Sequence, residues 1–238
     1  MKRTARPPRD EIAICQDNAA GYTSYVQDSV NQSRADANGV SLADYIHVIF
    51  GLVLQSGARR VLMIGCGGGT LATMLHARDV KVAIVDINAA SFMIARRHFR
   101  LPRGVMCHVA DGVAFLRDSE RRYDAIVLDA YAGKAIPGQF LTPDFMTLVK
   151  LRLAGPDAFF IVNVIAAGLR DRTVRRVERL METEWPCVRV MHAKSGGSHN
   201  ALVMAGAVAG FKRPKLEMPP LVGRGELRKA LNDYAFRN

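Results

Sequence analysis

The chain has 238 residues, 49% of them hydrophobic, which is enough for one domain with a sizeable core and a small appendage. Its uninterrupted apolar runs fall far short of the roughly 18 residues that a membrane-spanning helix needs, so we expect no membrane partner. The net charge of +11 keeps nucleic acid and acidic metabolites open as partners, whereas four widely spaced cysteines and scattered histidines exclude a disulfide framework and predict no metal.

Residues 1–40 are predicted to form a basic leader followed by a loop-like segment rich in Asn, Asp, Gln and Ser. The leader has no apolar signal core, which favours a cytoplasmic protein. From Leu42 to Leu54, apolar residues recur at helical spacing. We expect this helix to pack on the edge of a sheet or to cover a pocket.

Residues 41–210 are predicted to form the catalytic domain, because short β-branched runs alternate there with amphipathic segments. The expected strands are Val61–Gly65, Val80–Asp86, Gly104–Ala110, Tyr123–Ala130, Ala158–Ile165, Cys187–Ala193 and Ala201–Ala207. The expected helices are Thr70–Ala77, Ala89–Arg97, Gly112–Arg117, Pro143–Leu151 and Asp171–Glu182. This order predicts an α/β fold with a doubly wound, Rossmann-like and mostly parallel sheet.

The last two expected strands are joined by the short segment Lys194–Asn200, which leaves no room for a crossover helix. A C-terminal antiparallel hairpin is therefore predicted. By analogy of fold, such an ending is typical of S-adenosylmethionine-dependent methyltransferase-type sheets and disfavours a nicotinamide-binding sheet. Residues 211–238 are expected to be a basic C-terminal linker with a short helix over Gly225–Tyr234.

A glycine loop follows the first strand of this series. Glycines at 65, 67 and 69 allow a sharp turn and a close approach of the backbone to a ligand, and Asp86 follows at the distance typical of a ribose-binding carboxylate. The pattern predicts a nucleoside site in which Cys66, Gly67 and Gly68 make contact through their place in the loop. A catalytic thiol at Cys66 is not expected, because no basic partner stands near it in the sequence.

Acidic residues close three successive strands, at Asp86, Asp111 and Asp129. Carboxylates that converge on one sheet edge repel one another unless a cationic or hydroxyl-rich ligand lies between them, and a sulfonium nucleoside is both. We expect Asp86 to bind the ribose hydroxyls, Asp111 the adenine amino group, and Asp129 to face the sulfonium or the nucleophile. The alternative for Asp86 and Asp111 is a purely structural role as helix N-caps.

These motifs together resemble the spermidine synthase family, the polyamine aminopropyltransferases. The matching pieces are Gln32-Ser33, Tyr45, the glycine loop, Val85-Asp86-Ile87, Ala110-Asp111-Gly112, Tyr123 to Asp129 and Leu141 to Phe145. The resemblance implies nucleoside contacts at Gln32, Gly65, Asp86, Ile87, Asp111 and Gly112, with Asp129 as the proton acceptor. It implies Tyr45 on the substrate side, where we also expect Tyr131 unless that ring merely packs under its loop.

The chain also departs from the family pattern. The loop has Gly68 where the family carries an aspartate, and Ala132 where it carries a second aspartate after the catalytic one. His47 replaces a glutamate, and the N-terminal β-domain is expected to be missing in its usual form. A dicationic diamine would lose charge-assisted hydrogen bonds, so we expect an acceptor that is smaller, neutral or anionic, or else full S-adenosylmethionine as donor.

The sequence thus predicts a transferase that moves an aminopropyl group from a decarboxylated S-adenosylmethionine-type donor to a small-molecule amine acceptor, with Asp129 as base. The alternative is an S-adenosylmethionine-dependent methyltransferase, although Met63 stands where such enzymes often carry an acidic residue. A nicotinamide oxidoreductase fits poorly because of Thr70. A noncatalytic nucleic-acid binder would depend on charge alone, chiefly at Arg172, Arg175, Arg176 and Arg179. A homodimer is expected.

Overall fold

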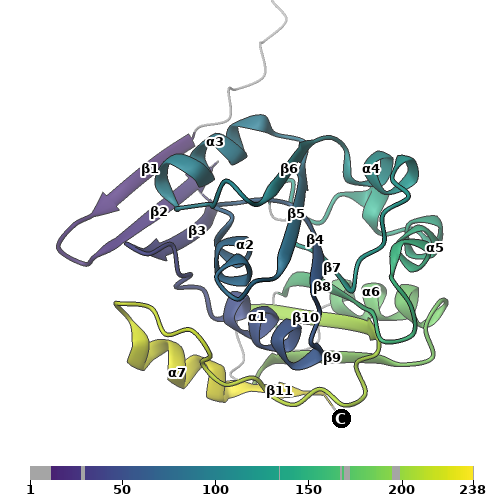
Figure 1. Cartoon of the computed structure of the whole chain (residues 1–238). Helices are drawn as coiled ribbons and strands as arrows, with labels where there is room; N and C mark the ends of the chain where they lie inside the picture. Colours follow the sequence, from purple (N-terminus) through teal and green to yellow (C-terminus); the bar gives the residue numbers. More distant parts are fainter. Residues whose placement is uncertain are drawn as a thin grey trace, which may run out of the picture.

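A computed structural model of the chain describes residues 12–27, 30–133, 135–166, 168, 172–194 and 199–237, so the basic leader lies outside the described residues (Figure 1). The central element is a sheet in the order β11-β9-β10-β8-β7-β4-β5-β6. Its strands are β4 (Arg60–Ile64), β5 (Lys81–Asp86), β6 (Met106–Val109), β7 (Ala125–Leu128), β8 (Phe159–Ala166), β9 (Val188–Ala193), β10 (His199–Gly206) and β11 (Tyr234–Phe236).

The directions of the strands confirm the predicted α/β class. Strand β4 pairs in parallel with β5 and β7, and β8 continues the parallel set beyond β7. Strand β10 inserts antiparallel between β8 and β9, so that Val203 faces Val162 on one side and Val190 on the other. The predicted C-terminal antiparallel hairpin is therefore present.

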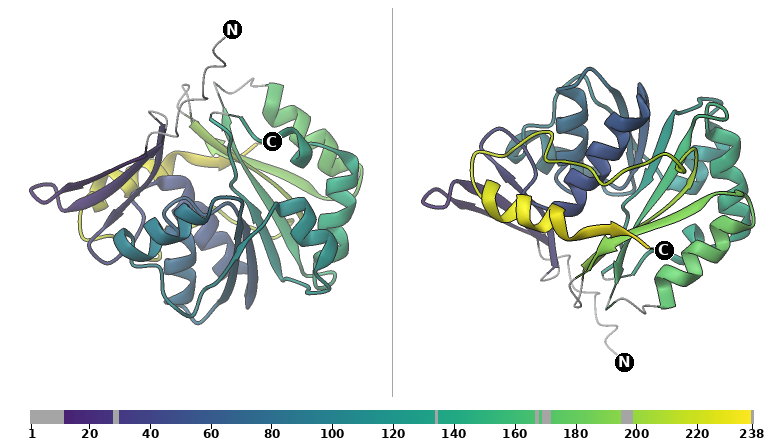
Figure 2. Two further views of the ribbon diagram at one scale, coloured as in Figure 1. Left: turned by 90° about the horizontal axis from the view of Figure 1, so that it is seen from above. Right: turned by 90° about the horizontal axis from the view of Figure 1, so that it is seen from below.

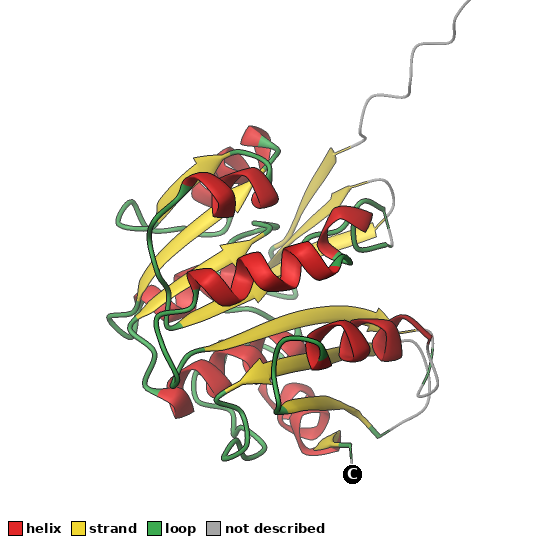
Figure 3. Ribbon diagram, turned by 90° about the vertical axis from the view of Figure 1, so that its right-hand side faces the viewer, coloured by secondary structure: helices red, strands yellow, loops and turns green. Residues whose placement is uncertain are grey.

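Helices cover both faces of this sheet, as the end-on views show (Figures 2 and 3). One face carries α1 (Asp44–Ser56), α2 (Thr70–His76), α3 (Ala89–His98) and α7 (Arg224–Asp233). The other carries α4 (Gly112–Asp118), α5 (Pro143–Arg152) and α6 (Arg172–Glu182), with the short 3-10 helix η1 (Gly138–Phe140) before α5. All four residues of β7 are buried because it lies at the centre, which explains its continuous apolar sequence.

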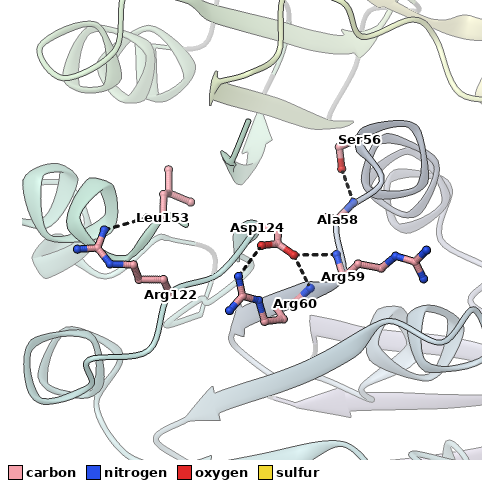
Figure 4. A network of polar contacts seen from close by, with 7 residues as sticks. All are labelled: Ser56, Ala58, Arg59, Arg60, Arg122, Asp124 and Leu153. Carbon is pink, nitrogen blue, oxygen red and sulfur yellow. Dashed lines mark hydrogen bonds and ion pairs between the residues drawn. The ribbon is translucent and has the colours of Figure 1, made fainter. Parts of the chain in front are cut away.

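The N-terminal ends of the central strands are joined by Asp124. Its Oδ2 accepts hydrogen bonds of 2.9 Å from the backbone N–H groups of Arg59 and Arg60, and its Oδ1 accepts one of 3.1 Å from the Arg60 guanidinium (Figure 4). Asp124 and Asp129 flank β7 at opposite ends. The first acidic residue of the Tyr123 to Asp129 motif is therefore structural.

The expected loop-like segment before α1 is instead a three-stranded antiparallel sheet, so that expectation is wrong. Strands β1 (Ile12–Asp17), β2 (Tyr22–Gln27) and β3 (Val30–Asp36) pair in sequence order and lie beside α3 (Figure 1). Tyr25 and Ala35, each 1% exposed, pack on Phe99. Among the described side chains of these strands only Ser24, Tyr25, Ala35 and Asp36 are buried, so most of the segment is as polar as a loop, which accounts for the error.

The C-terminal segment lies along α1 (Figure 2). The side chain of Gln55 and the backbone of Lys212 exchange two hydrogen bonds of 3.0 Å, and the Leu221 N–H donates to Asp36 Oδ2 at 2.7 Å. The expected short helix is present as α7, and β11 then pairs with β9 at the sheet edge. The division into segments 1–40, 41–210 and 211–238 stays a prediction.

Candidate active site

Two adjoining cavities lie at the C-terminal ends of β4, β5 and β7. The larger has a volume of about 510 Å³, and the residues that line it include Tyr25, Gln27, Gln32, Gly65, Cys66, Gly67, Asp86, Ile87, Asp111, Gly112, Asp129, Tyr131, Gln139 and Phe140. The smaller has a volume of about 130 Å³ and is lined on the side of β3, α1 and β8. We refer to them below as the larger and the smaller cavity.

The glycine loop contributes Cys66 and Gly67 to the lining of both cavities. Gly65 has a φ of +100°, and a Cβ there would lie 2.2 Å from the backbone oxygen of Asp129, so the close approach of β4 to β7 requires glycine. The N–H of Gly68 donates to Ser33 Oγ at 2.8 Å, and that of Cys66 to Asp86 Oδ2 at 2.8 Å. Gly68 is thus turned toward β3 and is not among the residues lining either cavity.

Asp86 ends β5 and lines the larger cavity. Its Oδ2 holds the Cys66 N–H, and its Oδ1 accepts from the Asn88 N–H at 2.7 Å. Burial raises the pKa of this carboxyl, although the two N–H groups act in the opposite direction. Each carboxylate oxygen can accept more than one hydrogen bond, so Asp86 can also receive two vicinal hydroxyl groups. It does not cap α3, because the N-cap of that helix is Asn88.

Asp111 is the N-cap of α4, so it has the capping role that was considered for it. Its Oδ1 accepts hydrogen bonds of 3.0 Å from the N–H groups of Val113 and Ala114, and its Oδ2 accepts one from Gln139 at 2.5 Å. The same carboxylate lines the larger cavity. Next to it, a Cβ at Gly112 would lie 2.7 Å from Ile64, so this glycine allows α4 to approach β4 closely.

The larger cavity combines acid groups with an apolar surface. Asp86, Asp111 and Asp129 all line it, and no Lys, Arg or His is among its described lining residues. Ile87, 76% exposed, projects at its edge. A nucleoside fits this composition, since carboxylates receive hydroxyl and amino hydrogens while a flat base packs against an apolar side chain.

Asp129 lines both cavities and is held by two donors. Asn163 Nδ2 donates to its Oδ1 at 2.7 Å, and the Tyr45 hydroxyl donates to its Oδ2 at 3.2 Å. Asn163, which is 2% exposed, is itself fixed by Asn200, whose Nδ2 donates to Asn163 Oδ1 at 2.8 Å. Burial raises the pKa of the Asp129 carboxyl above its ordinary value, although both donors lower it. Such a carboxylate is a stronger proton acceptor than an exposed one.

Tyr131 lies in the wall between the cavities and is fixed by β8. Its hydroxyl donates to the backbone oxygen of Asn163 at 2.7 Å and accepts from the Ile165 N–H at 2.8 Å. Because those two bonds occupy the hydroxyl, the ring contributes shape to both cavities. Tyr45 also lines the smaller cavity, so the two expected substrate-side tyrosines meet there.

Several lining residues were not predicted from the sequence. Tyr25 and Gln27 come from β2, which was taken for a loop, and the Tyr25 hydroxyl donates to Gln27 Oε1 at 2.7 Å. Asn163 and Asn200 face the site from the adjacent strands β8 and β10. The signal for the asparagines was present, since each is a polar residue within or beside a buried apolar run, where it needs a partner.

Other residues considered from the sequence stand apart from the chemistry. Burial raises the pKa of the Cys66 thiol, which keeps it protonated. His47 is 1% exposed, and its Nε2 lies 2.7 Å from the backbone oxygen of Ser41, so it lines neither cavity. Across the described part of the chain, no cluster of three metal-ligating side chains occurs and no helix has the length and hydropathy to cross a bilayer.

A family model described as a methyltransferase domain matches residues 61–137, from β4 to the loop before η1. A polyamine aminopropyltransferase of Chromobacterium violaceum is 29% identical over 167 residues, which cover 68% of this chain and 62% of that protein. The eEF1A lysine and N-terminal methyltransferase homolog of Drosophila pseudoobscura pseudoobscura is 25% identical over 183 residues, which cover 68% of this chain and 27% of that protein. The chain thus spans less than two thirds of the length of either relative.

The fold is shared with a solved structure of a probable spermidine synthase from Corynebacterium glutamicum. The TM-score is 0.77 at 17% identity, and the match covers 100% of this chain and 91% of that one. These relatives are named as an aminopropyltransferase, a methyltransferase and a probable spermidine synthase. The methyltransferase-type fold predicted from the sequence is confirmed. The chain is thus similar to the polyamine aminopropyltransferases and to methyltransferases, and it has the methyltransferase-type fold that it shares with the spermidine synthase structure.

Proposed function

We propose that this protein transfers an alkyl group, of the aminopropyl type, from a sulfonium nucleoside in the larger cavity to an amine in the smaller one. The observation that carries the proposal is the position of Asp129, which lines both cavities and is buried with a raised pKa. A base at the boundary of two binding sites is where a transfer between them needs a proton acceptor.

In this proposal most of the site residues bind the donor, and one residue, Asp129, accepts the proton. Asp86 is proposed to receive the ribose hydroxyls and Asp111 the adenine amino group, while Ile87 packs on the base. The sulfonium of the donor makes the adjacent carbon electrophilic and leaves as a neutral thioether. Its positive charge is favoured beside a carboxylate, since the larger cavity holds three acidic residues and no described basic one.

The proton balance assigns Asp129 its role. The amine nitrogen forms the new bond to carbon, the carbon–sulfur bond breaks, and its electron pair stays on sulfur. For that bond to form, the nitrogen must give up one proton so that its lone pair is free, and Asp129 takes this proton. An ordinary alkylamine with a pKa near 10 is protonated at neutral pH, so removing a proton is needed on the acceptor side. A neutral leaving group needs no acid on the other side.

A methyltransferase is the second candidate, favoured by the match of residues 61–137 to a methyltransferase domain and by the Drosophila relative. The same residues would hold full S-adenosylmethionine. The two candidates differ at the donor's far end, where S-adenosylmethionine carries an amino acid group. Met63, which lines the smaller cavity, offers no hydrogen bond to that group's ammonium.

The test is calorimetric titration with S-adenosylmethionine, its decarboxylated form and methylthioadenosine, followed by mass spectrometry of any nucleoside that copurifies. Binding of methylthioadenosine and the decarboxylated donor in preference to S-adenosylmethionine would support aminopropyl transfer. Preference for S-adenosylmethionine, with S-adenosylhomocysteine copurifying, would support methyl transfer instead. If none of the three releases heat, the protein does not act on sulfonium nucleosides.

A further inference from the structure

We propose that the acceptor is a small monoamine whose remainder is uncharged, and that the smaller cavity selects against diamines. This inference rests on the proposed function, because it concerns the second substrate of the same transfer. It is carried by the lining of the smaller cavity, which contains a single carboxyl group, that of Asp129, among its described residues.

The polar lining of this cavity is almost entirely neutral. Carboxamides are contributed by Asn31, Gln32, Asn163 and Asn200, and hydroxyls by Ser33, Tyr45, Thr70 and Tyr131. No Glu, Lys, Arg or His lines the cavity within the described residues. One positive charge can therefore be matched, at Asp129, and a second ammonium in the same space would meet only amide and hydroxyl oxygens.

A second ammonium would therefore be penalised. Hydrogen bonds that involve a charged group are stronger than those between neutral groups, and a cation removed from water without a counter-charge loses more than it regains. The volume of about 130 Å³, about a quarter of the larger cavity's 510 Å³, leaves little space for water to accompany it. A neutral end group of the same size has no such penalty.

Two side-chain amides of the smaller cavity are available to form hydrogen bonds with the end of the acceptor that lies away from Asp129. Asn163 is fully engaged with Asp129 and Asn200, whereas the side-chain amides of Asn31 and Gln32 have no hydrogen-bond partner among the described residues. Leu71 and Ile165 add apolar surface beside them. This combination suits a short hydrocarbon that ends in a methyl, hydroxyl or amide group.

The experiment measures binding instead of turnover. Protein saturated with methylthioadenosine, which fills the larger cavity, is titrated with butylamine, 4-aminobutanol and putrescine (1,4-diaminobutane) at fixed pH and ionic strength. We expect butylamine or 4-aminobutanol to bind at least about tenfold more tightly than putrescine, which corresponds to the loss of one charged hydrogen bond. Equal or tighter binding of putrescine would overturn the inference, and so would binding of none of the three amines.

A designed variant tests the cause. Asn31→Asp adds a carboxylate of nearly the same shape to the lining and should shift the ratio of putrescine to butylamine affinity at least about tenfold toward putrescine. Asn31→Ala is the matched control, because it removes the amide without adding charge and should not shift the ratio toward putrescine. A ratio that does not move in Asn31→Asp, or that moves equally in both variants, contradicts the assignment.

Titration with methylthioadenosine alone keeps the two proposals separate. If the nucleoside binds and the amine preference is the reverse of that expected, only the acceptor assignment fails. If the nucleoside does not bind, the proposed function fails first.

Discussion

At the scale of single residues, the site depends on how Asp129 is buried without losing its hydrogen bonds. A carboxylate that accepts from both Tyr45 and Asn163 is held in one orientation, and burial still raises its pKa. Orientation and basicity thus come from the same surroundings. The position of Asp129 could be predicted from the sequence because it ends a buried strand. The pairing of Asn163 with it could not, since that contact crosses from β8 to the neighbouring β7.

Replacing the proposed base tests its role most directly. Asp129→Asn keeps the shape but cannot accept the proton, so we expect turnover to fall about 10²- to 10⁴-fold while nucleoside affinity stays nearly unchanged. Asp124→Asn makes the same chemical change at the other end of β7 and should retain turnover per folded molecule. Steady-state kinetics and calorimetry on both variants check this, and an active Asp129→Asn protein would contradict the role of base.

The raised pKa of Asp129 also predicts how stability depends on pH. The folded protein holds this proton at pH values where the unfolded chain, with an ordinary carboxyl pKa of 3.8, has released it. Stability therefore falls as the pH rises from about 3.8 through the raised value, and the contribution is absent in Asp129→Asn. Urea unfolding of both proteins across this range should show the wild type gaining relative stability toward low pH. A constant difference would argue against the raised pKa.

At the scale of elements, the predictions are accurate where the strands are buried on both faces. Strand β7 and helix α3 lie within about two residues of their expected bounds, because continuous apolar runs and helical spacing are strong signals. Strand β2 was missed because only Ser24 and Tyr25 in it are buried, which is too few to give an apolar pattern, and with it the cavity residue Tyr25 was missed. The cavities are lined by residues that come from, or directly follow, several strands: β2, β3, β7, β8 and β10. Which of these strands lie side by side depends on the order of strands in the sheets, and that order cannot be deduced from local sequence.

The glycine loop allows a sharp test of packing at this scale. In Gly65→Ala the new Cβ would clash with Asp129, in addition to the strain of about 1–2 kcal/mol for a side chain at positive φ. Gly57→Ala has a similar φ, +70°, but nothing lies within 4 Å of its Cβ, so it should show the strain alone. We expect Gly65→Ala to be clearly the less stable in urea and to lose methylthioadenosine binding. Equal unfolding midpoints would contradict this account.

At the scale of the whole molecule, the sheet, its two helical layers and the small N-terminal sheet act together to form the two cavities. Gln32 reaches both from β3, while β4, β5 and β7 contribute the loop and the carboxylates. No described residue that lines the two cavities is basic, and part of the positive charge of the described chain lies elsewhere, for example in the exposed arginines of α6 at 172, 175, 176 and 179. The homodimer expected from the sequence stays a prediction.

Because the donor site joins elements from across the fold, its ligand should stabilise the folded protein globally. At a concentration of methylthioadenosine 100 times its dissociation constant, we expect about 2.7 kcal/mol of added stability. For a domain of this size that corresponds to a rise in Tm of roughly 5–10 °C. Differential scanning calorimetry with adenosine as a comparison ligand measures it, and no shift at the highest methylthioadenosine concentration would show that the nucleoside does not bind the folded protein preferentially.

The two outer strands of the eight-stranded sheet are short, with three residues in β11 and four in β6. An outer strand leaves backbone groups that another chain can pair with, and a template this short supports few such pairs. The large sheet is consequently protected against growth into intermolecular β-structure at both ends. This protection depends on the last few residues, since without β11 the six-residue strand β9 would become the edge.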